Sequence, residues 1–208
     1  MRLFCFFAVV LFSSVAQAQS ITVSGTVRIT KAQSPFRFSA ITIMTGKLII
    51  DPGVVLEATS ESARISLALQ ANSTIEAIGT PDQPIVFAPA AGVPSWRGIT
   101  NTERVSSRPN VKLHNVILAQ TQIDLGSANV DFLNVDMTSP KMIGVYAARG
   151  FSFRNNSVGS LVNCSIDGST TGFSFPANTM IFENCEAINC TTAIGSTSRP
   201  VVFSAMVR

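Results

Sequence analysis

Four basic residues close together in the sequence are the main candidates for chemistry in this chain: Arg104, Arg108, Lys112 and His114. Lys112 and His114 are separated by one residue, so on a β-strand both side chains would point to the same side. A base among them, held against a sugar acid, could remove a proton and start a β-elimination. The alternative is a solvated strand face on which Asp131, one repeat further along the chain, pairs with Lys112.

Three aspartates and the single tryptophan are weaker candidates. Asp124, Asp131 and Asp136 could supply the carboxylate pair of a glycosidase, which needs a separation of about 5–9.5 Å. They could also bind Ca²⁺, although no loop is dense in oxygen ligands. Trp96 is either a platform on which a sugar stacks or a packed residue of the scaffold. Trp96 and Asp131 are therefore the candidates for substrate binding, and we expect no cofactor.

The cysteines raise the question of a disulfide or a metal site. Asn163-Cys164 and Asn184-Cys185 occupy equivalent positions in two successive repeats. In a stacked repeat their Cα atoms would be about 4.8 Å apart, close enough for a disulfide, but parallel side chains favour stacked thiols. His114 is the only histidine and lies far from them, so a zinc site is not expected. Cys190 aligns with Ser169 and should be the most exposed cysteine.

Hydrophobic residues recur with a period of two, which indicates short β-strands and no long helix. Examples are Ile41/Ile43, Ile65/Leu67, Val111/Leu113 and Phe151/Phe153. The segments between them are rich in Gly, Pro, Asn, Ser and Thr, which are typical of turns.

The sequence also contains a second, longer repeat in addition to this alternation. Leu161, Phe182 and Phe203 form one evenly spaced series. Two further series are Leu113, Phe132, Phe153 and Phe175, and Asn115, Asn134 and Asn155. Such a repeat is typical of a solenoid. The sequence therefore predicts an all-β fold, a single parallel β-helix of about nine coils with ~21 residues per coil. Asparagine at a fixed position can adopt the left-handed conformation of a sharp bend and form a hydrogen-bonded ladder.

The segment Gly46–Ile99 resembles the opening coils of right-handed parallel β-helix proteins of the pectate-lyase-like superfamily. The similar pieces are Pro52–Val54, Gly79–Thr80, Pro84–Phe87 and Trp96–Ile99. The resemblance extends from about Ile21 to the C-terminus and implies a right-handed helix. It implies little about function, since this fold carries lyases, hydrolases, adhesins and inert scaffolds. The N-T-D, D-D, G-H-G and R-x-K blocks of its polygalacturonases, and the R-x-P-x-x-R block of its pectate lyases, are absent.

Residues 1–18 have the pattern of a secretory signal peptide: Arg2, an apolar run and an Ala16-Gln17-Ala18 cleavage motif. We therefore expect export to the periplasm or the extracellular space, and no membrane span. Residues 19–45 are expected to form an N-terminal cap and the first strands, and residues 46–208 the β-helix. A net charge of +3 gives no reason to expect nucleic acid as a partner.

The C-terminal segment Pro200–Arg208 repeats an earlier strand and stops within a coil. We expect either a truncated C-terminus or self-association through the uncapped last coil. These observations favour a secreted non-catalytic scaffold that acts at a surface or envelope or binds carbohydrate. The alternative is a lyase that acts on acidic polysaccharide, with its site around Lys112.

Overall fold

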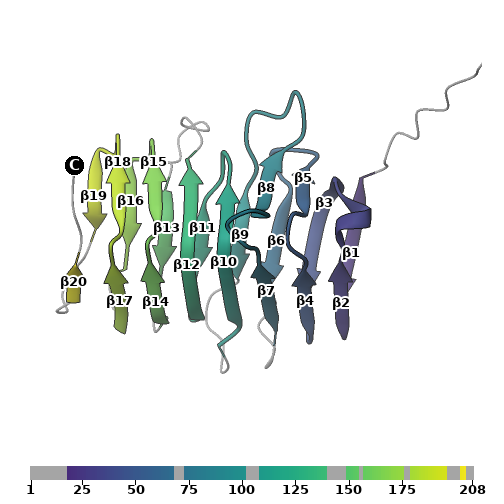
Figure 1. Ribbon diagram of the computed structural model, residues 1–208, viewed down its shortest axis with the longest axis horizontal. Helices are drawn as coiled ribbons and strands as arrows, with labels where there is room; N and C mark the ends of the chain where they lie inside the picture. Colours follow the sequence, from purple (N-terminus) through teal and green to yellow (C-terminus); the bar gives the residue numbers. More distant parts are fainter. Residues whose placement is uncertain are drawn as a thin grey trace, which may run out of the picture.

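The computed structural model describes residues 18–67, 73–101, 108–139, 149–154, 157–175, 179–195 and 202–204. Within these ranges it contains twenty β-strands and one short 3₁₀ helix, η1 (Lys31–Gln33). All pairings between the named strands are parallel. The strands stack side by side along the long axis of the molecule, in sequence order from one end to the other (Figure 1). This is the all-β solenoid, a parallel β-helix, that the sequence predicts.

The strands lie on three faces. The first face contains β2 (Thr26–Ile29), β4 (Lys47–Ile50), β7 (Thr74–Ile78), the N-terminal halves of β10 (Asn110–Leu118) and β12 (Asn129–Thr138), β14 (Val158–Val162), β17 (Thr179–Glu183) and β20 (Val202–Ser204). The second face contains the N-terminal half of β3 (Phe36–Ile43), β5 (Val55–Ala58), β8 (Ile85–Pro89), the C-terminal halves of β10 and β12, β15 (Ser165–Asp167) and β18 (Glu186–Ile188).

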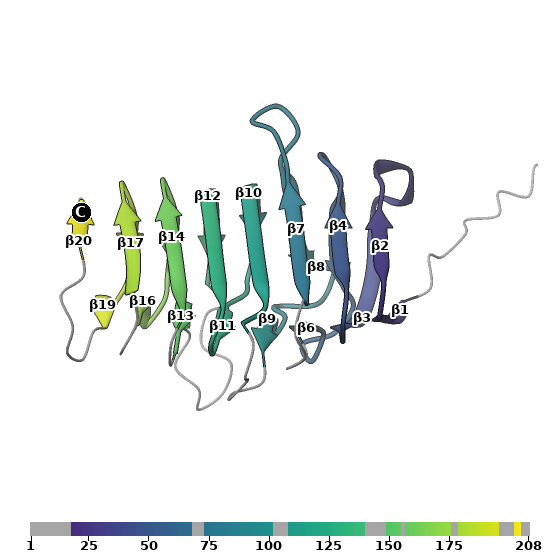
Figure 2. The same cartoon turned by 90° about the horizontal axis from the view of Figure 1, so that it is seen from below.

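The third face contains β1 (Gln19–Val23), the C-terminal half of β3, β6 (Arg64–Leu67), β9 (Gly98–Asn101), β11 (Ile123–Leu125), β13 (Arg149–Phe153), β16 (Thr171–Ser174) and β19 (Thr192–Gly195). Figure 2 shows the first-face strands in one row and the third-face strands in another. Because β3, β10 and β12 each bend across a corner, the three faces form one continuous sheet.

Alternation along each strand separates the core from the surface. On the third face Ile41, Ile65, Ile99 and Ile123 are paired in register and fully buried. The row continues with Phe151, whose ring stacks on that of Phe173 at 5.3 Å between centroids. Each inner residue therefore contacts its equivalents on the coils before and after it, and the core is a set of stacked rows.

Asparagine forms a ladder at the corner between the first and second faces. Asn115, Asn134, Asn163 and Asn184 have φ of 51–53°, the left-handed conformation that turns the chain from one face to the next. The Nδ2 of each of the last three donates to the Oδ1 of the preceding asparagine, at 3.0, 3.1 and 3.2 Å. The predicted ladder is confirmed, but its third member is Asn163. Asn155, which the sequence suggested, lies outside the described residues.

The coils are not of uniform length. On the first face the step from Thr26 to Lys47 matches the predicted repeat. The steps from Thr74 to Asn110 and from Asn129 to Val158 are much longer. The described part of the chain therefore forms eight rungs on this face, compared with the predicted nine or so. The longer step after Asn129 also corrects one phenylalanine series, because Phe132 pairs with Leu161 and not with Phe153.

The predicted N-terminal segment 19–45 contains β1, β2, η1 and β3, and its strands already pair in register with those of the next coil. The signal peptide, except for Ala18, lies outside the described residues. Across the ranges that the structure describes, no helix has the length and apolar character needed to cross a membrane.

Candidate functional site

Lys112 and His114 lie on the first face and share one carboxylate. Val111 and Leu113 are buried, so the two basic side chains point outward as predicted. Lys112 Nζ is 3.2 Å from Asp131 Oδ2, and His114 Nε2 is 3.0 Å from Asp131 Oδ1. The predicted pairing of Lys112 with Asp131 is confirmed, and Asp131 engages the histidine as well.

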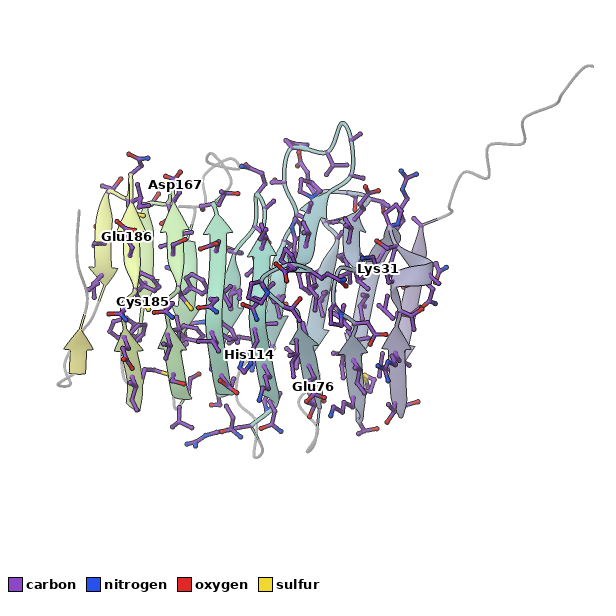
Figure 3. The ribbon with its side chains drawn as sticks, viewed as in Figure 1. Lys31, Glu76, His114, Asp167, Cys185 and Glu186 are labelled. Atoms are coloured by element: carbon purple, nitrogen blue, oxygen red, sulfur yellow. The ribbon has the colours of Figure 1, made fainter. Side chains whose placement is uncertain are left out.

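The first face carries alternating charges along the axis. Lys112 is in register with Glu76 on one side and Asp131 on the other, and Lys47 forms an ion pair with Glu76. Glu76 and His114 both lie on this face (Figure 3). Burial disfavours ionisation of Asp131, but the contacts from His114 and Lys112 outweigh it and lower its pKa. The cations here are therefore compensated by carboxylates of neighbouring coils.

Of the other two members of the predicted basic group, the structure describes only Arg108. Arg108 is exposed and precedes the start of β10. Arg104 is outside the described residues. Of the predicted basic group, the structure thus brings Lys112 and His114 together at Asp131.

The three candidate aspartates lie on three different faces. Asp131 belongs to the first face, Asp136 to the second and Asp124 to the third. They cannot form the carboxylate pair of a glycosidase, so that interpretation is wrong. Among the residues that the structure describes, no three His, Cys, Asp or Glu side chains gather where they could hold a metal ion.

Trp96 is part of the core. It is 1% exposed, its ring stacks on Phe87 and meets Phe38 edge to face, and its Nε1 donates to Ala119 O at 3.1 Å. Both contacts pack the indole inside the protein, which supports the second of the two interpretations, a packed residue of the scaffold.

The cysteines belong to the repeat. Cys164 and Cys185 are buried one coil apart beside the asparagine ladder, and both are free thiols (Cys185 is labelled in Figure 3). The neighbouring Cys185 thiol, together with burial, raises the pKa of Cys164, which keeps the Cys164 thiol protonated at neutral pH. Cys190 is half-buried, and its sulfur lies 3.2 Å from Ser169 Oγ on the preceding coil, as the alignment predicts.

A groove of about 440 Å³ lies on the third face, and Asp124 is the one earlier candidate among its described lining residues. It crosses consecutive coils from β3 to the end of β13. Its lining residues are Thr42, Arg64, Ser66, Leu67, Arg97, Thr100, Asn101, Gln122, Asp124 and Arg154.

The floor of the groove is a row of polar side chains that point outward. Thr42, Ser66, Thr100 and Asp124 are paired in register, one on each of four successive coils. Adjacent members are therefore about 4.8 Å apart along the axis. The row offers hydroxyl and carboxylate groups at a regular spacing to a ligand that lies along it.

Three arginines border this row, and they differ in their partners. Arg154 binds Asp124 through two hydrogen bonds, from Nε to Oδ1 at 2.9 Å and from Nη2 to Oδ2 at 3.1 Å. Burial raises the pKa of Asp124, and the neighbouring Ser152 hydroxyl and the charges of Arg149 and Arg97 only partly offset this. Arg64 and Arg97 are exposed, and within the described ranges neither forms an ion pair with a carboxylate.

Gly98 and Asn101 keep the backbone under the groove closely packed. Gly98 has φ of +90°, and a Cβ there would collide with the carbonyl oxygen of Gln122. Asn101 is buried in an inner row, where its Nδ2 donates to Ser127 O at 3.2 Å and its Oδ1 accepts the N–H of Gly126. These two residues fix the distance between the coils that carry Thr100 and Asp124.

Sequence reasoning missed the groove. Its residues lie on coils of unequal length, because the step from Ser66 to Thr100 is longer than the steps from Thr42 to Ser66 and from Thr100 to Asp124. A search at the predicted period does not align them. The usable signal was the pair of short polar–apolar alternations around Ser66 and Thr100.

Searches of protein-family models, of curated proteins and of solved structures find no match to this chain.

Proposed function

We propose that this chain is an exported, non-catalytic β-helix that binds a polysaccharide along the groove of its third face. The observation that carries the proposal is the row of Thr42, Ser66, Thr100 and Asp124, which repeats hydrogen-bonding groups coil by coil along the groove. A chain of sugars also repeats its hydroxyl groups along one direction. Arginine and aspartate at the border of the row supply further donors and acceptors.

Two features of the sequence support the proposal. The signal-peptide pattern of residues 1–18 favours export, where a polysaccharide-binding protein would meet its ligand. The resemblance of Gly46–Ile99 to β-helices of the pectate-lyase-like superfamily is consistent with a carbohydrate ligand.

The geometry of the first face favours binding over catalysis. A base for β-elimination must be able to accept a proton from the substrate. His114 and Lys112 instead both face the Asp131 carboxylate, and Lys112 is also in register with Glu76. The Lys112 ammonium is therefore paired with a carboxylate of the protein itself, and the groove lies on the third face rather than around Lys112 and His114. This supports the scaffold interpretation over a lyase with its site around Lys112.

The proposal is tested by binding measurements on a panel of neutral and acidic polysaccharides. Thr100→Phe should fill the groove and weaken binding at least about tenfold. The matched control is Thr22→Phe, because Thr22 is exposed in the same row but does not line the groove. Equal affinities for the two variants, or no binding by the wild-type chain to any polysaccharide, would contradict the proposal.

The same panel tests the lyase alternative. Incubation with uronate polymers should give no unsaturated product, which is detected by its ultraviolet absorbance. Product formation that is lost in Lys112→Ala or His114→Ala would instead assign a lyase site to the first face.

A further inference from the structure

Three arginines on the outer surface of this β-helix are each matched to a carboxylate on an adjacent coil. Arg28 Nε donates to Asp51 at 2.8 Å, Arg37 Nε donates to Glu57 at 2.9 Å, and Arg154 binds Asp124. In each case the stacked coils bring the two side chains together, and one guanidinium takes one carboxylate.

Other described arginines, Arg108 and Arg149 among them, form no such ion pair, but of the arginines without one only Arg64 and Arg97 line the groove. Arg64 is in register with Gly98, and the N–H of Arg97 donates to Ala63 O at 2.9 Å, so the two arginines lie on adjacent coils. Both line the groove, and neither forms an ion pair with a carboxylate in the described part of the chain. Among the described residues of the lining, Asp124 is the only carboxylate, and it is bound by Arg154. Two guanidinium groups with donors to spare therefore border one cavity.

The chemistry of these two groups defines what would satisfy them. Each guanidinium presents a planar fork of N–H donors that suits a bidentate oxyanion. The two guanidinium groups together present more N–H donors than the two oxygens of a single carboxylate can accept when both groups approach it from the same side. A sulfate ester has three terminal oxygens in a tetrahedral arrangement, so it can accept from both forks at once.

We propose that Arg64 and Arg97 form a subsite for a sulfate ester on the bound polysaccharide. The inference rests on the proposed polysaccharide-binding function and names the acid group that its ligand carries. Arg154 contributes less charge to the subsite, because Asp124 already neutralises it. The sulfate lies over β6 and β9, and the sugar chain continues along the row of Ser66 and Thr100.

The test compares three polymers of one backbone and matched chain length: dextran, carboxymethyl dextran and dextran sulfate. The wild-type chain should bind dextran sulfate at least about tenfold more tightly than carboxymethyl dextran. Arg64→Gln and Arg97→Gln should each weaken dextran sulfate binding about tenfold and leave dextran binding unchanged. Inorganic sulfate is measured as a fourth ligand, to separate the ester from the free ion.

Arg108→Gln is the matched control variant. Arg108 is exposed, and removing it costs the chain the same positive charge away from the groove. Its affinity for dextran sulfate should stay within about twofold of the wild-type value. If Arg108→Gln weakens dextran sulfate binding as much as Arg64→Gln does, the binding reflects general attraction to polyanions, and the proposed subsite is wrong.

The remaining outcomes separate the two proposals. If carboxymethyl dextran binds as tightly as dextran sulfate, or if the arginine variants bind normally, the sulfate subsite is wrong while polysaccharide binding stands on the Thr100→Phe result. If inorganic sulfate binds and no polymer of any panel does, the site takes a free anion and the polysaccharide function is wrong.

Discussion

Asp131 supplies the carboxylate that two basic residues of the first face contact. Its carboxylate contacts both Lys112 and His114, the two residues that the sequence offered as bases. The Lys112 ammonium is paired with this carboxylate on the neighbouring coil, so Lys112 contributes to the cohesion of the coils and is not free to bind an acidic substrate. The contrast with Arg64 and Arg97, which have no such ion pair within the described ranges, is the main difference between the two faces.

Asp131 also predicts a dependence of stability on pH. Its contacts with His114 and Lys112 outweigh burial and lower its pKa below 3.8. The carboxylate therefore stabilises the fold fully above that value, and the contribution is lost as the pH falls through the lower pKa of the folded state. Since the Asp131 side chain is 50% exposed, the contribution is modest, about 0.2–1 kcal/mol.

Asp131→Asn should accordingly lower the free energy of unfolding at about pH 7 and have a smaller effect at about pH 2.5. Urea denaturation at the two pH values measures this. Asp82→Asn is the control, because Asp82 is exposed and forms no ion pair in the described structure. If Asp131→Asn lowers the free energy of unfolding by the same amount at both pH values, the charge of Asp131 is not the cause of its stabilising effect.

At the scale of elements, the asparagine ladder positions the first and second faces. Each member turns the chain at a left-handed φ and ties its side chain to the next coil. The left-handed conformation and the hydrogen-bonded ladder contribute separately to the stability of the fold. Alanine loses both, while glycine loses the ladder and retains access to the left-handed conformation.

Asn163→Ala should therefore destabilise the protein by about 2–3 kcal/mol, from a left-handed alanine and two lost hydrogen bonds. Asn163→Gly should cost about 1 kcal/mol less than alanine. Chemical denaturation of the two variants beside the wild-type chain measures both values. If the alanine variant is as stable as the glycine variant, the left-handed turn is not what asparagine provides here.

Equal spacing decided which elements could be predicted from the sequence. Lys112 and Asp131, Asn163 and Asn184, and Cys164 and Cys185 lie on coils whose lengths are close to the predicted repeat, and their stacking followed from simple alignment. The link from Asn134 to Asn163 spans a longer coil and was missed. A β-helix fixes the length of its strands, because they must pair, and leaves the segments between them free to vary.

The groove was missed for the same physical reason. Its floor joins coils of unequal length, so no single period brings Thr42, Ser66 and Thr100 together. Trp96 could not be assigned from the sequence for a different reason. Tryptophan is common both in sugar-binding surfaces and in cores, and only the three-dimensional packing shows that its ring contacts both Phe38 and Phe87.

At the scale of the whole molecule, the stacked coils give each face its own charge pattern. The first face alternates Lys47, Glu76, Lys112 and Asp131, so its charges largely cancel. The third face combines a row of polar side chains with two guanidinium groups that have donors to spare beside a groove. The net charge of +3 is too small for strong attraction to every polyanion. Selectivity must therefore come from where the charges lie.

The most direct test of the account is a map of the bound polysaccharide on the protein by NMR. The backbone amide signals are assigned, and the tightest-binding polysaccharide of the panel is titrated into the labelled chain. We predict that the signals of Ser66, Thr100 and Asp124 shift, and that those of Lys112 and Asp131 do not. Shifts confined to Lys112, Asp131 and their neighbours would place the ligand on the first face and contradict the account.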